Sequence, residues 1–303
     1  MPKIETNGLS AQFINQNFVR KLEEGRVKEA ADEGSRFIRA KMRQDSFARE
    51  ILEPVELGPD EIDRDEHTDQ PKKIIEKEPD STATFVTFKG TGERTWFKGP
   101  RYSVKFGKVE SQHFVKSKFE LLTYQNDIRK ILTDNSVKDM ADQEDAKFIE
   151  TVKAAHGAAT GAAATLKNGV LTAASINTGI KTLLSRKIPV GKILMTKSRY
   201  YDALEMEASV IGNDVASRHY DEGVESEQKL FGIPVITTIK NDIINDDDLF
   251  FFGPQEYLGN FFLLQDATLF IKQEADIIEF WSYSAPGIGI GNTNAIVHLN
   301  LGA

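Results

Sequence analysis

The chain has 303 residues, of which 40% are hydrophobic and 28% are charged, and its formal net charge is −8 at pH 7. This length allows one large domain or two ordinary ones, and the composition is normal for a soluble globular protein. The negative charge argues against an electrostatic grip on nucleic acid as the main function. Because the chain has no cysteine, disulfides, thiolate metal sites and cysteine nucleophiles are excluded.

Hydropathy gives no sign of membrane insertion or export. No apolar run approaches the roughly 20 residues of a membrane-spanning helix, so we expect no contact with a membrane. The first residues lack the apolar core of a signal peptide. Together with the absence of cysteine, these features fit the reducing cytoplasm.

Residues 1–52 are predicted to form an N-terminal arm. Gly25 and Gly34 interrupt its helical pattern, and an apolar series that includes Phe37 and Phe47 follows. With two breaks and few apolar residues, this stretch would have difficulty forming a core of its own. We therefore expect the arm to lie across other surfaces, with Phe37 and Phe47 contacting a neighbouring subunit. A helical N-terminal subdomain is the alternative.

The composition changes sharply in residues 53–82. Eight carboxylates face a single base, Arg64, before Pro71. Low apolar content and like charge favour an extended, weakly structured acidic linker. A calcium loop needs alternating ligands and a glycine turn, which are missing, so we predict no cation site in this segment.

Residues 83–116 are predicted to form an extended hairpin with strands at 84–88 and 102–106. The second strand has the alternating apolar pattern of a half-buried strand. An isolated two-stranded ribbon is marginal in water, and the tip carries large apolar rings, so we expect a neighbouring subunit to cover it. The predicted contacts are Trp96, Phe97 and Tyr102, and the predicted turn residues are Gly90, Gly92, Gly99 and Pro100.

A long helical stretch, residues 117–157, follows the hairpin. Its apolar residues cluster on one face before residues 133–136 and on roughly the opposite face after them. Either one long helix has different partners at its two ends, or two helices meet at these residues, which favour caps. Thr123 is the predicted first cap and Gly157 the predicted stop. Gly157 and Gly161 lie in a run of small residues that we interpret as a hinge.

Residues 158–259 are interpreted as an α/β region, followed by strands. Two short strands within residues 229–238 are expected to pivot at Gly232, with Pro234 at a sheet edge. The predicted helices are residues 175–184, capped by Ser175, and residues 198–206, capped by Ser198. The other predicted strands are residues 192–195, 249–252, 260–264, 268–272, 277–283 and 295–299.

No motif for catalysis or metal binding is found. The five histidines are scattered, without a pair at metal-binding spacing, and no nucleophile elbow occurs. Residues 286–292, Pro-Gly-Ile-Gly-Ile-Gly-Asn, lack the lysine and the helix that complete a phosphate loop, so we predict a tight turn between strands. We therefore predict no catalytic, metal or cofactor site and no enzyme. The alternative among enzymes is a soluble α/β enzyme that uses carboxylates without a recognisable sequence motif.

Several short sequence segments resemble those of the major capsid protein of tailed double-stranded DNA bacteriophages, which has the HK97-type fold. The resemblance covers most of the chain, from about Phe37 to Leu301, and its specificity comes from the order and spacing of the segments. Residues 40–51 are similar to the family's N-terminal arm, 84–113 to its E-loop hairpin, 121–152 to its spine helix, 230–235 (Leu-Phe-Gly-Ile-Pro-Val) to a recurrent strand pair, and 266–270 and 294–299 to its closing strands.

The resemblance implies an α+β, HK97-like capsid fold with an N-terminal arm, an E-loop, a long spine helix, a P-domain sheet and an α/β A-domain. The P-domain would combine the spine helix, residues 117–157, with return strands in residues 260–293. The A-domain would comprise residues 158–259 and a closing strand in residues 294–303.

The resemblance also implies a function. The chain would be a structural subunit that assembles as hexamers and pentamers into an icosahedral shell and contacts the packaged double-stranded DNA non-specifically. Its other partners would be portal and scaffold proteins and, in some members, decoration proteins. The protein would reside in the virion after assembly in the host bacterial cytoplasm. An encapsulin-like compartment with the same fold is the alternative.

Overall fold

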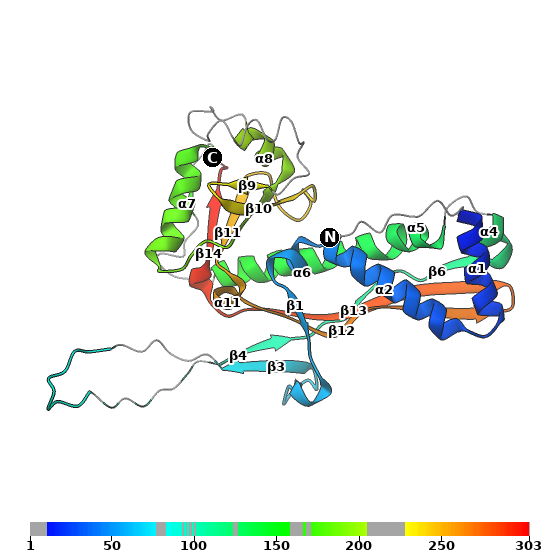
Figure 1. Cartoon of the computed structure of the whole chain (residues 1–303), viewed down its shortest axis with the longest axis horizontal. Coiled ribbons are helices and arrows are strands. Elements are labelled where there is room, and N and C mark those ends of the chain that lie inside the picture. Colours follow the sequence, from blue (N-terminus) through cyan, green and yellow to red (C-terminus); the bar gives the residue numbers. More distant parts are fainter. Residues whose placement is uncertain are drawn as a thin grey trace.

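The computed structural model describes residues 11–76, 83–92, 94, 96, 99, 101–123, 127–157, 166–167, 171–204 and 228–302. Figure 1 shows three parts. A long two-stranded ribbon runs beside a row of helices, a six-stranded sheet with its own helices stands at one end of that row, and a hairpin projects below it.

The ribbon consists of β12 (Gly259–Glu274) and β13 (Ile277–Ile290), which pair antiparallel along almost their whole length. Bulges between Leu263 and Thr268 join the two strands that were predicted at 260–264 and 268–272 into one. The predicted turn at 286–292 is wrong, because residues 286–290 continue β13. Three short strands extend the ribbon into a sheet: β1 (Pro54–Glu56), β5 (Val109–Glu110) and β6 (Phe114–Ser117).

The row of helices contains the predicted change of face. It occurs at a π-helical turn, η2 (Thr133–Val137), which inserts an extra residue per turn and so rotates the apolar stripe. The prediction that Thr123 begins the first helix is wrong, since Thr123 ends α4 and the Asp127 side chain accepts a 2.8 Å hydrogen bond from the Lys130 amide. The helices are α4 (Lys118–Thr123), α5 (Ile128–Leu132) and α6 (Lys138–Gly157), the last ending at Gly157 as predicted.

Residues 11–51 form helices that contribute to a core of their own subunit, so the helical alternative to the predicted arm holds. Its helices are α1 (Ala11–Glu23), α2 (Val27–Asp45) and α3 (Phe47–Ile51). Val19, Ile38 and Met42 are buried against α5 and the ribbon. Gly34 does not break α2; a side chain there would collide with Leu269 of β12, so the glycine permits close packing.

The predicted acidic linker is also wrong, because most of its described residues are in regular structure. Two of its isoleucines, Ile74 and Ile75, lie in a strand that pairs with the strand before Phe106. The elements are η1 (Pro59–Glu61), β2 (Asp63–Arg64) and β3 (Pro71–Glu76), and β3 pairs with both β2 and β4 (Arg101–Lys105).

The six-stranded sheet confirms most strands predicted from the sequence. Gly232 has a positive φ of 79° at the predicted pivot, and Pro234 lies one strand in from the edge. In spatial order the strands are β7 (Leu166–Lys167), β14 (Ile296–Asn300), β11 (Asp248–Phe252), β8 (Lys192–Thr196), β10 (Ile233–Thr238) and β9 (Lys229–Leu230).

Short helices flank this sheet. The cap of α7 is Thr172 and not Ser175, since the Thr172 hydroxyl accepts from the Ser175 amide at 3.2 Å and the Ser175 hydroxyl accepts from the Thr172 amide at 2.9 Å. The helices are α7 (Ala173–Ser185), α8 (Lys197–Leu204), α11 (Gln255–Leu258) and η4 (Thr293–Ala295).

A glycine in α7 gives a test of this packing. Alanine normally stabilises a helix relative to glycine by roughly 0.5–1 kcal/mol. A Cβ on Gly179, however, would lie 2.5 Å from the Phe251 ring of β11. We therefore expect Gly179→Ala to lower the free energy of unfolding by about 1–3 kcal/mol in urea denaturation. Gly157→Ala, in α6 with nothing within 4 Å, is the matched control and should be neutral or mildly stabilising; equal effects would contradict the packing described.

Candidate assembly surfaces

The hairpin is built from β3 and β4, in a register that pairs Ile75 with Tyr102 and Lys73 with Val104. The predicted first strand at residues 84–88 is therefore wrong, since the described residues 83–92 form no strand and belong to the loop. The hairpin is longer than the sequence suggested, because β3 ends at Glu76 and β4 begins at Arg101.

The base of the hairpin is fixed to the ribbon. Val104 and Phe106 are buried against Phe262 of β12. The Asn260 side-chain amide donates a 3.0 Å hydrogen bond to the Tyr102 hydroxyl. Burial raises the pKa of Tyr102, and this hydrogen bond opposes the rise only in part. Tyr102, one of the predicted inter-subunit contacts, is thus half-buried on its own subunit; its contact with a neighbour stays a prediction.

The loop of the hairpin exposes large apolar side chains. Phe85 and Phe88 have relative exposures of 111% and 112%, and Trp96 has 97%. Figure 1 shows the described part of the loop far from the rest of the chain. Covering such a ring is worth roughly 1.5–3 kcal/mol, and the described residues of this chain do not provide the cover. The predicted turn residues Gly90, Gly92 and Gly99 lie in this loop, whereas Phe97, Pro100 and Gly161 fall outside the described residues.

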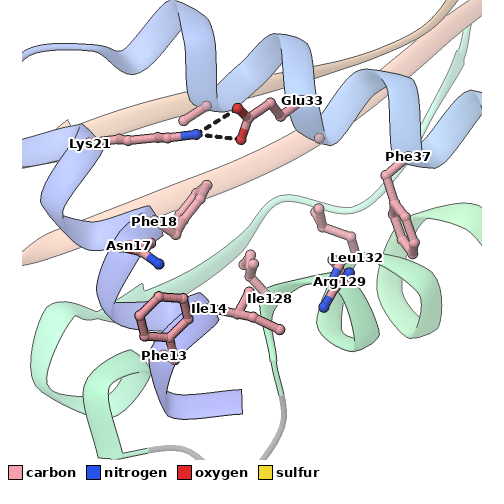
Figure 2. A pocket seen from close by; sticks show the side chains of 12 residues that line it. Phe13, Ile14, Asn17, Phe18, Lys21, Glu33, Phe37, Ile128, Arg129 and Leu132 are labelled. Atoms are coloured by element: carbon pink, nitrogen blue, oxygen red, sulfur yellow. Dashed lines mark hydrogen bonds and ion pairs between the residues drawn. The ribbon is translucent and has the colours of Figure 1, made fainter. Parts of the chain in front are cut away.

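A second apolar surface is a pocket of about 270 Å³ between α1, α2 and α5. Figure 2 shows Phe13, Phe18 and Phe37 around it, with the Lys21–Glu33 ion pair (2.6 Å) beside it. Phe13 is 48% exposed, and Phe37 is half-buried. Phe37 therefore retains an open face, and its contact with a neighbouring subunit stays a prediction.

Phe47 differs from the other predicted contacts. It is only 5% exposed and meets the Phe148 ring edge-on, with 6.3 Å between ring centroids. Because its own subunit already covers it, we withdraw Phe47 from the predicted inter-subunit contacts. Sequence analysis missed other exposed apolar residues, including Phe119 of α4 at 73% and Ile239 after β10 at 77%. They lie on parts of the chain away from the hairpin loop.

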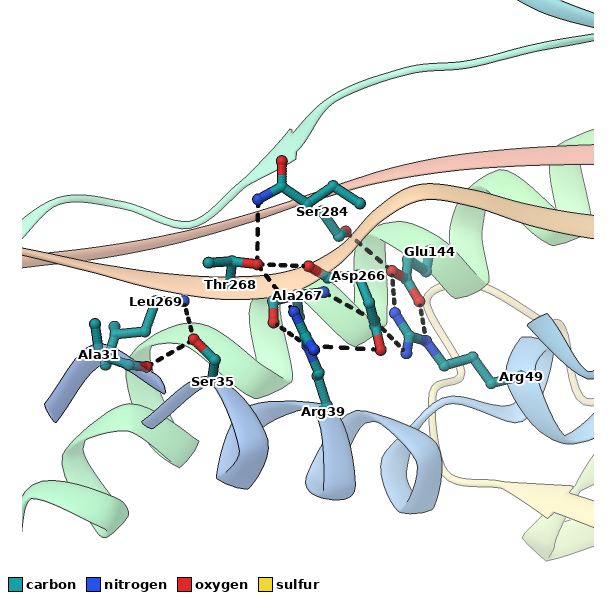
Figure 3. A network of polar contacts seen from close by, with 11 residues as sticks. Ala31, Ser35, Arg39, Arg49, Glu144, Asp266, Ala267, Thr268, Leu269 and Ser284 are labelled. Carbon is teal, nitrogen blue, oxygen red and sulfur yellow. Dashed lines mark hydrogen bonds and ion pairs between the residues drawn. The ribbon is translucent and has the colours of Figure 1, made fainter. Parts of the chain in front are cut away.

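A buried ionic cluster joins the arm to the ribbon; we name it the Arg49 junction (Arg49, Glu144, Asp266 and Ser284). In Figure 3 the Arg49 guanidinium lies between the two carboxylates. Its Nε and Nη2 donate to Glu144 at 2.7 and 2.9 Å, and its Nη1 donates to Asp266 at 2.9 Å. Ser284 donates to Glu144 at 3.1 Å. Burial alone would lower the pKa of Arg49, but Glu144 and Asp266 raise it above its ordinary value.

The same region satisfies the backbone groups freed by the bulges of β12. The Ser35 hydroxyl of α2 accepts a 2.9 Å hydrogen bond from the Leu269 amide. The Arg39 guanidinium donates to the Ala267 carbonyl at 2.9 Å (Figure 3). Polar side chains of α2 thus compensate the irregular strand, which otherwise would bury unpaired backbone groups.

Lys240, in the turn after β10, extends this contact to the six-stranded sheet. Its ammonium binds Asp145 of α6, and Asp142 at 2.8 Å. Asp145 also accepts from the Ser46 hydroxyl at 2.8 Å. Burial opposes the charge on Lys240, but Asp145 and Asp142 outweigh it and raise the pKa of Lys240. The arm, α6, the ribbon and the sheet therefore meet in one polar region.

No metal-binding cluster is found among the described residues. They contain no group of three histidine or carboxylate side chains placed to hold a metal ion. His298 pairs with Asp248 at 2.7 Å, which fastens β14 to β11. Burial opposes ionisation of Asp248, but hydrogen bonds from His298 and Asn300 outweigh it and lower the pKa of Asp248. No described helix is long and apolar enough to span a bilayer.

Comparison with known proteins gives matches in structure only. No family model and no curated protein matches this sequence. The fold superposes on a virus-like particle from Pyrococcus furiosus with a TM-score of 0.59 at 13% identity, covering 90% of this chain and 100% of that one. For the capsid of a native GTA particle the TM-score is 0.58 at 15% identity, covering 85% and 91%.

The chain has the capsid-subunit fold. A third similar structure, the capsid of cyanophage P-SCSP1u, has a TM-score of 0.57 at 13% identity and covers 78% of this chain and 85% of its own. The fold that the sequence resemblance implied is thereby confirmed. The capsid fold also accounts for a subunit whose hairpin loop has no cover among its own described residues.

The Arg49 junction gives a stability test. Arg49→Met retains the apolar volume but leaves two buried carboxylates without their cation. We expect it to lower the free energy of unfolding by about 3–5 kcal/mol in urea denaturation. The control is Arg26→Met, whose exposed pairs with Glu24 and Glu29 should contribute less than about 1 kcal/mol.

A combined variant identifies the cause of that loss. Adding Glu144→Gln and Asp266→Asn to Arg49→Met removes the stranded charges, so part of the lost stability should return. If the triple variant is as unstable as the sum of its three single substitutions, the ionic account of the junction is wrong.

A histidine of α6 predicts pH dependence. His156 is buried, with its ring perpendicular to that of His298 at 5.5 Å. Burial, followed by the charges of His298 and Arg186, lowers the pKa of His156 below 6.5. The unfolded chain therefore takes up this proton more readily, and stability should fall as pH drops below about 6.5. Thermal unfolding from pH 7.5 to 5.5 should show a smaller loss for His156→Gln; an unchanged slope would contradict this assignment.

Proposed function

We propose that this protein is the structural subunit of an icosahedral shell that encloses the double-stranded DNA of a tailed bacteriophage. The observation that carries the proposal is the combination of the capsid-subunit fold with a loop whose aromatic rings the described part of the chain leaves uncovered. In a single copy that apolar area is exposed to water, and contact with a second copy would bury it.

The proposed contact between copies is heterologous, because it joins two different surfaces of the same chain. The hairpin loop lies at one end of the molecule, and the pocket between α1, α2 and α5 lies near the other (Figure 1, Figure 2). Interfaces between different surfaces of identical copies form rings when the rotation between copies closes, and open filaments when it does not. Hexamers and pentamers are the rings that an icosahedral shell requires, and we propose that this chain forms both.

The charge of the chain suits a container for DNA. Because the net charge is −8, the shell contacts the packaged duplex only weakly and non-specifically. We further propose a portal, a scaffold and, where present, decoration proteins as partners, assembly in the host bacterial cytoplasm, and the virion as final location. An encapsulin-like compartment is less favoured, because the similar structures include several phage capsids.

Electron microscopy of the expressed protein, combined with nuclease protection of particles from infected cells, tests the proposal. Closed shells that protect duplex DNA are the expected result. Uniform small shells filled with protein would indicate the encapsulin-like alternative. A small discrete oligomer without particles would overturn the assignment and reopen the enzyme hypothesis.

The loop aromatics give a sharper test. Trp96→Ser combined with Phe97→Ser should leave unfolding free energy unchanged within about 0.5 kcal/mol, because Trp96 is exposed in the single subunit. Assembly should fall at least about tenfold, because apolar area lost from the contact weakens every copy of it. Lys89→Ser, which removes an exposed polar side chain from the same loop, is the control. Normal shells from the double variant would show that the loop is not a significant contact.

A further inference from the structure

The glycine-rich segment near the end of β13 has a structural role that its sequence did not suggest. Gly287, Gly289 and Gly291 occupy alternate positions, so a side chain at any of them would lie on the same side of the strand. Ile288 and Ile290 point to the other side, where they pack against the large apolar core. The two faces of this strand segment thus have opposite character: one carries branched side chains and the other carries none.

The bare face lies directly under β4 of the hairpin. A Cβ on Gly287 would lie 2.6 Å from the Phe106 ring. One on Gly289 would collide with Cγ2 of Val104, and one on Gly291 would lie 2.7 Å from the Tyr102 hydroxyl oxygen. Three glycines therefore face three alternate side chains in order, those of Tyr102 and Val104 in β4 and of Phe106 just after it. These side chains rest on the backbone of β13 and of the residue that follows it.

Separate contacts hold the hairpin in this position along the strand. The Gly107 amide donates to the Pro286 carbonyl at 3.0 Å at one end. The Asn260 side chain donates to the Tyr102 hydroxyl at the other end. The glycines determine the distance between the hairpin and β13. Carbon atoms in contact stay about 3.5–4.0 Å apart, and a strand without side chains on this face permits the closest approach.

We propose that Gly287, Gly289 and Gly291 form a seat that sets the pose of the hairpin on the ribbon, and thereby the place where the aromatic loop meets its neighbour. A methyl group on the seat would lift or tilt β4. Because the loop continues from the end of β4 beyond the seat, a tilt of β4 also shifts the loop, and the shift grows with distance from the seat. The inference deepens the proposed function, and rests on it only for its consequence in assembly.

The pose can be measured without assembly. The chain has no cysteine, so Ser103→Cys on β4 and Lys147→Cys on α6, both exposed, allow a single pair of spin labels. Distances are measured by pulsed electron paramagnetic resonance on the unassembled full chain. Gly289→Ala should shift the mean distance by at least about 1 Å or broaden its distribution, because the new Cβ and Val104 cannot occupy the same space.

Two further variants make the test specific. Gly107→Ala adds the same methyl group at the end of β4 with nothing within 4 Å, so the distance should stay that of the unsubstituted protein. Val104→Ala removes the groups that collide, so Gly289→Ala combined with Val104→Ala should return the distance toward its original value. Should Gly289→Ala fail to fold, as judged by circular dichroism, Gly291→Ala takes its place, because the Tyr102 ring can rotate.

Assembly provides the second readout. Gly289→Ala should reduce the fraction of subunits in closed shells at least about tenfold, and the combination with Val104→Ala should restore it. If the unsubstituted protein forms no shells, the proposed function fails and the distance measurement still judges the seat. An unshifted distance for a folded Gly289→Ala or Gly291→Ala variant, or a shift for Gly107→Ala as large as theirs, would overturn the proposal.

Discussion

The antiparallel pairing of β12 with β13 is the interaction on which the other parts of this subunit depend. The arm helices pack on it, the short strands β1, β5 and β6 extend it, and the hairpin rests on one end of it. Its bulges interrupt the ladder between Leu263 and Thr268, and polar side chains of α2 bond to backbone groups there. Regular pairing supplies length and stiffness, and the irregular part supplies the place where other elements attach.

The subunit combines a well-packed body with one uncovered extension. The body uses three apolar cores and the buried Arg49 junction, so the described elements fix one another in place. In the described part of the loop beyond β3 and β4, the rings of Phe85, Phe88 and Trp96 face water. A rigid body that presents an apolar extension is suited to assembly, since little conformational freedom remains to be lost in the body on binding.

The sequence predicted the elements whose patterns are local and missed those decided by distant partners. Strands 249–252 and 295–299, the pivot at Gly232 and the change of helical face at residues 133–136 were read correctly, because apolar spacing and turn chemistry act within a few residues. The first strand of the hairpin was misplaced, because Ile74 and Ile75 lie in a charged segment whose partner is almost thirty residues away. The Arg49 junction joins residues 95 and 217 positions apart, and no local pattern announces such a pairing. The glycines of β13 were read as a turn, because their bare face becomes meaningful only when β4 lies on it.

The position of the ribbon along the chain has a consequence for biosynthesis. Both of its strands lie in the last fifth of the sequence, whereas the helices and the hairpin that pack on them are translated first. During translation Arg49 and Glu144 are made long before Asp266, and the apolar faces of α1 and α2 have no sheet to cover them. The nascent chain thus cannot complete this fold until both strands of the ribbon have been made, and contacts of such long sequence separation form slowly. Until the ribbon is made, the apolar helices and unpaired strands of the earlier segments are exposed and prone to aggregate.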